Sequence, residues 1–169
     1  GNEIEVGAGA TITANSGSVT LDRQVYPVPW SSGQFYEHDG SSTVGTSGAG
    51  SIVLTISVTD EDYNTSPVGE DTIPAAKVTL EAFRGSSSTT IATSSDLVET
   101  TADSGVFETE VTIGAGQLIG TVALKQGDIL TVSYDDPTDA SGNAYTTTDS
   151  STLDLRTGSL MSDKSVYVR

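Results

Sequence analysis

Oxygen-bearing side chains crowd one short stretch of this sequence, SVTDEDYNTSPVGEDTI at residues 57–73. Asp60, Asp62 and Asn64 occupy alternate positions directly after an apolar run, and Asp71 lies near the end of the stretch. Carboxylate and amide oxygens are the ligands that Ca²⁺ prefers, because this ion accepts about six to eight oxygens in irregular geometry. The pattern is not an EF-hand, since Thr65 stands where that loop needs glycine and no helical pattern flanks it.

Two more acidic stretches have the composition of turns, ADSGVF at 102–107 and DDPTDASGN at 135–143. None of the three stretches contains a lysine or arginine, so carboxylates that met there would repel one another. We therefore predict bound calcium, with ligands drawn from Asp60, Asp62, Asn64, Asp71, Asp103, Asp135, Asp136 and Asp139. The alternative is that these are solvated acidic loops, in which Asp103 and Asn143 serve only as turn residues.

The net charge restricts the kind of partner. The 169 residues include 23 acidic and 7 basic side chains, which gives a formal charge of −16. This charge argues against nucleic acid and anionic membranes as partners and favours divalent and small monovalent cations. There is no cysteine, so disulfides and thiolate metal sites are excluded. No apolar run approaches the roughly 20 residues that span a bilayer, so we expect no membrane insertion by this segment.

Catalytic patterns are weak. His38 is the single histidine, and no Gly-x-Ser-x-Gly nucleophile motif accompanies it. Glu108 and Glu110 are paired on one strand, but the chain has few aromatic residues with which to build a sugar-binding cleft. We expect that this chain is not an enzyme.

Strand patterns must position the acidic residues. Alternating, β-branched segments bounded by Gly, Ser, Asp or Pro recur along the chain, at 3–13, 18–26, 51–59, 76–83, 96–101, 106–113, 129–135, 145–157 and 165–168. The segments between 18 and 157 predict an all-β fold, an immunoglobulin-like Greek-key β-sandwich of about seven strands that lacks the Cys-Trp-Cys core of antibodies. In that fold the three acidic stretches and the start of the first strand lie at one end of the sandwich.

A short repeat indicates the domain organisation. GSVTLDRQVY at 17–26 aligns without gaps to GSLMSDKSVY at 158–167, and a strand-like segment precedes each copy. We therefore predict one complete module at residues 17–157. Residues 1–16 would be the last strand of a preceding module or a linker, and residues 158–169 the first strand of the next. Chance similarity between strand sequences is the alternative.

Several segments carry a family resemblance. TLDRQVYPVPW, VTDEDYN followed by GEDTI, ADSGVFETEVTI and GDILTVSYDD resemble the immunoglobulin-like modules of the surface-layer (S-layer) proteins of ammonia-oxidising archaea, the Nitrososphaerota. The resemblance covers most of residues 17–157. It implies an extracellular, cell-surface location and neighbouring modules and copies of the chain as lattice partners. It also implies Ca²⁺ at acidic loops, in a porous acidic coat that attracts cations such as ammonium.

The expected function is thus a structural module of an S-layer. The alternative is a calcium-dependent, cadherin-like adhesin repeat or a glycan-binding module of another extracellular protein. Both share the expected fold and the expected ion, so the fold alone does not separate them.

Overall fold

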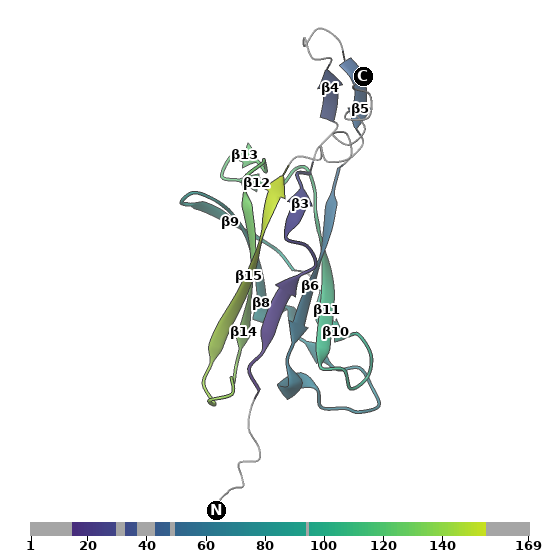
Figure 1. The fold of residues 1–169 in the computed structure, drawn as a ribbon, viewed down its shortest axis with the longest axis vertical. Helices are drawn as coiled ribbons and strands as arrows, with labels where there is room; N and C mark the ends of the chain where they lie inside the picture. The colour runs from purple at the N-terminus through teal and green to yellow at the C-terminus, as the bar shows by residue number, and fades with distance from the viewer. Residues whose placement is uncertain (1–14, 30–32, 37–42, 48–49, 94, 155–169) are drawn as a thin grey trace, which may run out of the picture.

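The computed structural model describes residues 15–29, 33–36, 43–47, 50–93 and 95–154, and within them the protein is all-β, as predicted (Figure 1). Two five-stranded sheets form the body of the fold. The first runs in the order β2 (Ser18–Leu21), β6 (Ile52–Thr59), β11 (Val106–Ile113), β10 (Leu97–Glu99) and β7 (Thr72–Ile73). The second runs in the order β3 (Val25–Pro27), β15 (Tyr145–Asp154), β14 (Ile129–Asp136), β8 (Val78–Arg84) and β9 (Ser87–Ile91).

Buried apolar residues alternate with more exposed residues along these strands. In β6, the residues Ile52, Leu54, Ile56 and Val58 are all buried, and in β14 Leu130, Val132 and Tyr134 are buried, as the sequence predicted. Successive strand side chains point to opposite faces, so these two series form the inner faces of the two sheets. The buried side chains form one core between the sheets.

The predicted first strand, 18–26, is wrong as a single element. β2 pairs antiparallel with β6 in the first sheet, whereas β3 pairs parallel with β15 in the second. The chain changes sheet at Asp22, whose carboxylate accepts hydrogen bonds from the Thr55 backbone N–H at 2.9 Å and from the Tyr26 hydroxyl. One short segment therefore ties both sheets together.

The prediction of about seven strands was too low. Each predicted segment between 18 and 157 contains a strand, but β7 and β9 extend the two sheets. β9 was not predicted because SSTTI has little apolar alternation. It forms a hairpin with β8 through Gly85, whose φ of 60° suits glycine. The order β2-β6-β11-β10 and β8-β14-β15 is that of strands A-B-E-D and C-F-G in immunoglobulin-type sandwiches. Membership of that class stays a prediction.

Small elements complete the fold. β4 (Gly33–Tyr36) pairs with β5 (Thr43–Ser47), and β12 (Leu118–Ile119) pairs with β13 (Val122–Ala123). The 3-10 turns η1 (Glu61–Tyr63) and η2 (Ala75–Lys77) flank β7. His38 and the predicted strands at 3–13 and 165–168 lie outside the described residues. None of the described helices is long and apolar enough to cross a membrane.

Candidate cation site at the acidic pole

One end of the sandwich gathers the acidic loops, and we call it the acidic pole: residues 15–17, 60–71, 99–105 and 135–144 (Figure 1). Hydrogen bonds join its parts. The Asp60 N–H donates to the Gly105 carbonyl at 3.0 Å, and the Gly17 N–H donates to Asp136 Oδ2 at 2.7 Å. The Ala140 N–H donates to Ser16 Oγ at 3.0 Å. The structure thus brings together the three acidic stretches and the start of the first strand, as the sequence led us to expect.

Asp60, Asp62 and Asp136 form a tight cluster at this pole. Each offers a carboxylate oxygen, and these oxygens lie within 4.8 Å of one another. Asp60 and Asp136 are each only 1% exposed, whereas Asp62 is exposed. Asp60 directly follows β6 of the first sheet and Asp136 ends β14 of the second, so the cluster joins the two sheets.

Hydrogen bonds fix the two buried carboxylates. Asp60 caps η1 by accepting from the Asp62 N–H at 2.9 Å, and its second oxygen accepts from the Tyr134 hydroxyl at 2.5 Å. Asp136 accepts from the Gly17 N–H at 2.7 Å and from the Thr138 N–H at 2.9 Å. These donors explain how both carboxylates tolerate burial, since buried polar groups need partners.

Gly17 lies directly against Tyr134 and the two buried acids, so its position leaves little room for a side chain. A Cβ atom there would lie 2.6 Å from Tyr134 Cε2, 3.1 Å from Asp60 Oδ2 and 3.3 Å from Asp136 Oδ2. Any larger residue would push the first strand away from the acids. The glycine therefore allows the Gly17 N–H to reach Asp136.

Burial and neighbouring carboxylates shift the pKa values of groups in and next to the cluster. Burial raises the pKa of Asp60, and the nearby Asp136 and Asp62 carboxylates raise it further, against the hydrogen bonds from Tyr134 and the Asp62 N–H. Burial and the bond to Asp60 also raise the pKa of Tyr134 well above its ordinary value, so its hydroxyl stays protonated and donates. No described lysine or arginine forms an ion pair with the three acids; the described ion pair is Arg84 with Asp128, at 2.5 Å.

Asn64 and Asp103 meet beside the cluster. The Asn64 Nδ2 donates to Asp103 Oδ1 at 3.1 Å and to Glu61 Oε1 at 3.2 Å. The Asn64 Oδ1 is buried and has no hydrogen-bond partner among the described residues. An acceptor left in this state favours a water molecule or a cation next to it.

The other three predicted ligands accept hydrogen bonds outside the cluster. Asp71 accepts from the backbone N–H groups of Thr65 and Ser66 at 2.7 and 2.8 Å, and the hydrogen bond from Ser66 is the main reason that its pKa is lowered. Asp139 accepts from the N–H groups of Ser141 and Asn143 within its own turn. Asp135 lies on the outer face of β14 and accepts from Thr146 Oγ1 at 2.8 Å. None of the three belongs to the tight cluster.

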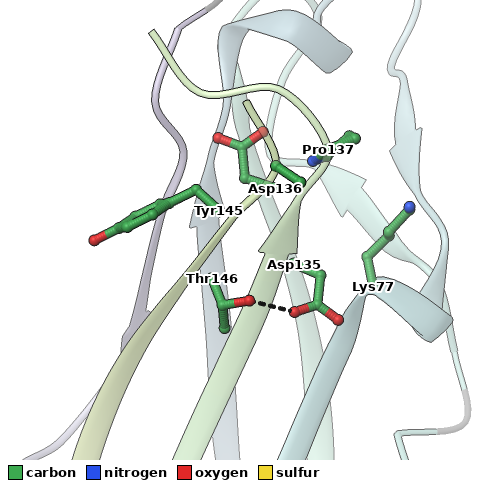
Figure 2. Close-up of a pocket in the computed structure, with 7 residues that line it drawn as sticks. Lys77, Asp135, Asp136, Pro137, Tyr145 and Thr146 are labelled. Atoms are coloured by element: carbon green, nitrogen blue, oxygen red, sulfur yellow. Dashed lines mark hydrogen bonds between the residues drawn. The ribbon is translucent and has the colours of Figure 1, made fainter. Parts of the chain in front are cut away.

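Asp135 lines a shallow pocket of about 440 Å³, together with Lys77, Asp136, Pro137, Ala144, Tyr145 and Thr146. Figure 2 shows the Asp135 carboxylate bonded to Thr146, with Lys77 to one side and the Tyr145 ring extending away on the other. Asp135 and Asp136 are neighbours in sequence, yet alternation along the strand separates their carboxylates. The Asp135 carboxylate therefore lies apart from the cluster, although both residues contribute to the pocket lining.

Sequence reasoning missed Glu99. Its side chain is 3% exposed, and its two carboxylate oxygens accept from the Asp71 and Gly105 N–H groups, each at 2.8 Å. The hydrogen bond from Asp71 is the main cause of its lowered pKa. Glu99 thus links the 60–71 loop to the 99–105 turn. The signal was present, because Glu99 is two residues after the buried Leu97 and shares its inward orientation.

The cluster is suited to a hard cation that prefers oxygen ligands. Three carboxylates from Asp60, Asp62 and Asp136 converge, and each carboxylate oxygen can accept more than one interaction, so the hydrogen bonds above leave lone pairs for an ion. Ca²⁺ would complete its shell of about six to eight oxygens with backbone carbonyls or water. Comparisons with protein-family models and with curated proteins find no match for this chain.

Proposed function

We propose that this chain is a structural module of an extracellular S-layer and that it binds Ca²⁺ at Asp60, Asp62 and Asp136. The observation that carries the proposal is the pair of nearly fully buried carboxylates at Asp60 and Asp136, which come from opposite sheets with no described basic partner. Because two such charges repel in a poorly solvated site, a divalent cation is the group that would stabilise them best.

The bound ion would link the two sheets. Asp60 and Asp136 would hold it between the two sheets, and Asp62 would contribute from the exposed side. Asp62 also accepts from the Asn15 N–H, with both oxygens at 3.1 Å, and Asp136 accepts from the Gly17 N–H. Charge neutralisation at the cluster would therefore also fix the direction in which the chain enters the sandwich.

The S-layer assignment rests on the sequence resemblance, and it agrees with an all-β fold and a charge of −16. Exposed acids on the strand faces, such as Glu108 and Glu110, would enrich cations including ammonium in the pores of an assembled layer. This attraction acts over about 8 Å at physiological ionic strength, so it needs many modules around a pore of similar width.

Calcium binding is tested on the full chain by titration calorimetry and by melting in EDTA and in Ca²⁺. At a free concentration 100 times Kd, one site should add about 2.7 kcal/mol to the free energy of unfolding. That gain corresponds to a melting temperature higher by about 5–11 °C for a domain of this size. Equal melting temperatures in EDTA and in millimolar Ca²⁺ would refute the site.

A matched pair of variants locates the ion. Asp136→Asn should abolish the calcium-dependent gain, whereas Asp135→Asn, which removes the same charge one residue away, should retain it. Asp62→Asn changes an exposed residue and should weaken calcium binding without unfolding the chain. A gain retained in both Asp62→Asn and Asp136→Asn, or lost in Asp135→Asn, would place the ion elsewhere.

Assembly is tested separately by electron microscopy of the chain with and without Ca²⁺. A lattice module should form ordered sheets. A chain that stays monomeric and instead binds a glycan on an array would support the adhesin alternative.

A further inference from the structure

The chain enters the sandwich as a strand in two parts, and we call β2 and β3 together the split strand. β2 pairs antiparallel with β6 over four residue pairs, and β3 pairs parallel with β15 over three. Two backbone hydrogen bonds belong to the second pairing. The Thr152 N–H donates to the Gln24 carbonyl at 3.0 Å. The Val28 N–H donates to the Asp154 carbonyl at 2.9 Å, so the split strand is bonded to both sheets.

The split strand and β15 run in the same direction, away from the acidic pole (Figure 1). The split strand begins at the pole, where the Gly17 N–H reaches Asp136, and β15 begins directly after the 135–144 loop. β15 has 10 residues, and strand residues rise about 3.4 Å each, so Asp154 lies roughly 30 Å from the pole. A pull on Asn15 and on Asp154 would thus act along the strands and not across them.

Tension in this direction loads both pairings in shear. The split strand would be pulled toward the pole while β15 is pulled away from it, so β3 and β15 would have to slide past each other. β2 would likewise have to slide along β6, which the rest of the first sheet holds. In shear the hydrogen bonds of a ladder carry the load together, whereas a ladder pulled apart from one end opens one close pair of bonds at a time. Shear is therefore the direction in which these short pairings resist best.

Asp22 connects the two pairings. Its Oδ1 accepts from the Thr55 N–H of β6 at 2.9 Å and from the Tyr26 hydroxyl of β3, and its own N–H donates to the Thr55 carbonyl at 3.1 Å. The Arg23 N–H also donates to the Tyr26 hydroxyl, at 3.2 Å, and Ser151 Oγ of β15 donates to the Arg23 carbonyl. The turn between β2 and β3 is thus bonded to both sheets, and it cannot straighten while these bonds hold.

We infer that the split strand is a mechanical clamp, which resists tension along the long axis of the sandwich, and that Asp22 makes its two pairings yield together. Without Asp22, β2 could slide off β6 first and leave β3 to carry the load afterwards. With Asp22 bonded to both strands, movement of β2 also breaks the bonds to Thr55 and Tyr26. The inference goes beyond the proposed function, since it requires neither a bound ion nor a lattice.

The test compares two pulling directions on the full chain with optical tweezers. The sequence has no cysteine, so introduced cysteines define where the handles attach under reducing conditions. Asn15→Cys with Asp154→Cys loads the split strand in shear. Asn15→Cys with Ser141→Cys places both handles at the pole, where the Ala140 N–H donates to Ser16 Oγ, so the split strand is peeled from its first residue.

Shear should require the larger force. The four residue pairs of β2 and β6 correspond to about two close pairs of hydrogen bonds, which shear loads together, so the unfolding force should be at least about two-fold higher than in peeling. Equal forces in the two directions, or a larger force in peeling, would overturn the clamp. The ratio should be the same in EDTA and in Ca²⁺, so failure of the proposed ion site is distinguishable from failure of the clamp.

Asp22→Ala tests the connection in the shear direction. It should lower the unfolding force and divide the single rupture into two steps, as β2 leaves before β3. Tyr26→Phe keeps the buried ring, removes only the hydroxyl, and should have the same effect to a smaller extent. Glu99→Gln is the control, because it alters a buried carboxylate outside the split strand and should retain one step at the force of the natural chain. A single step at the natural force in both Asp22→Ala and Tyr26→Phe would refute the role of Asp22.

Discussion

Gly17→Ala is the most direct test of how the acidic pole is built. The new Cβ would lie 2.6 Å from Tyr134 Cε2, whereas carbon atoms in contact are normally about 3.5–4.0 Å apart. The Tyr134 ring is fully buried at 0% exposure and held by its hydrogen bond to Asp60. The ring therefore cannot move aside easily, and the start of β2 must move by roughly 1 Å instead.

Overpacking of this kind costs about 1–3 kcal/mol. The substitution also reduces the entropy of the unfolded chain, which offsets about 0.4–1 kcal/mol. A net loss of about 1–2 kcal/mol should remain, equivalent to a melting temperature lower by about 2–8 °C. The backbone shift should also weaken the bond from the Gly17 N–H to Asp136, seen as a change in the Gly17 amide chemical shift.

The assay is urea denaturation of the full chain, with Gly116→Ala as the matched control. A Cβ at Gly116 meets no atom within 4 Å, and its φ is not positive. The control should therefore be unchanged or more stable by up to about 1 kcal/mol. If Gly17→Ala were as stable as Gly116→Ala, the packing of the first strand against Tyr134 and the acids would be refuted.

Three further substitutions probe the buried carboxylates. Tyr134→Phe removes a donor to Asp60 and should cost about 1.5–3 kcal/mol at pH 7. It should cost less at pH 4, because the raised pKa of Asp60 favours the protonated acid there, and equal losses in urea at both pH values would contradict this. Arg84→Met should lower the melting temperature at pH 7. Burial acts to raise the pKa of Asp128, but the hydrogen bonds and charges of Arg84 and Lys125 together outweigh it and the pKa is lowered. The stabilisation from the ionised Asp128 is therefore present above pH 3.8 and is lost as the pH falls. If the loss of melting temperature in Arg84→Met did not shrink toward pH 3, the result would argue against the ion pair. Glu99→Gln leaves one oxygen for two N–H donors, so the Asp71 or Gly105 amide should exchange its hydrogen faster at pH 7. The melting temperature of the variant should be lower than that of the natural chain at pH 7, and this difference should narrow below pH 4.5 as Glu99 becomes protonated. Unchanged exchange at both amides would exclude the linking role.

The sequence predicted much of the sandwich because apolar alternation is a local property. Leu130, Val132 and Tyr134 alternate in β14, and Ile52 to Val58 alternate in β6, so the inner face of each strand could be assigned without knowing its neighbours. The break at Asp22 and the strand β9 could not be assigned in this way. The first depends on a hydrogen bond to Thr55 from another strand, and the second on pairing with β8.

The same alternation carries information on the site that the loop-based prediction did not use. Asp60 is two residues after Val58, Asp136 is two after Tyr134, and Glu99 is two after Leu97, so each continues a buried series and turns inward. Asp135 falls on the opposite face for the same reason. A list of acids by loop does not make this distinction, whereas the period of two in a strand does.

Only the tertiary structure decided which inward acids meet. Asp60 and Asp136 end strands of different sheets, and they lie together because the sheets pack face to face with those two strand ends at the same pole. Asp71 and Asp139 instead turn back onto N–H groups of their own loops, a choice set by loop conformation and not by residue type. The sequence determined which carboxylates are carried inward, because the strand period is local. The packing of the two sheets determined which of them share a site, because that contact joins residues far apart in the chain.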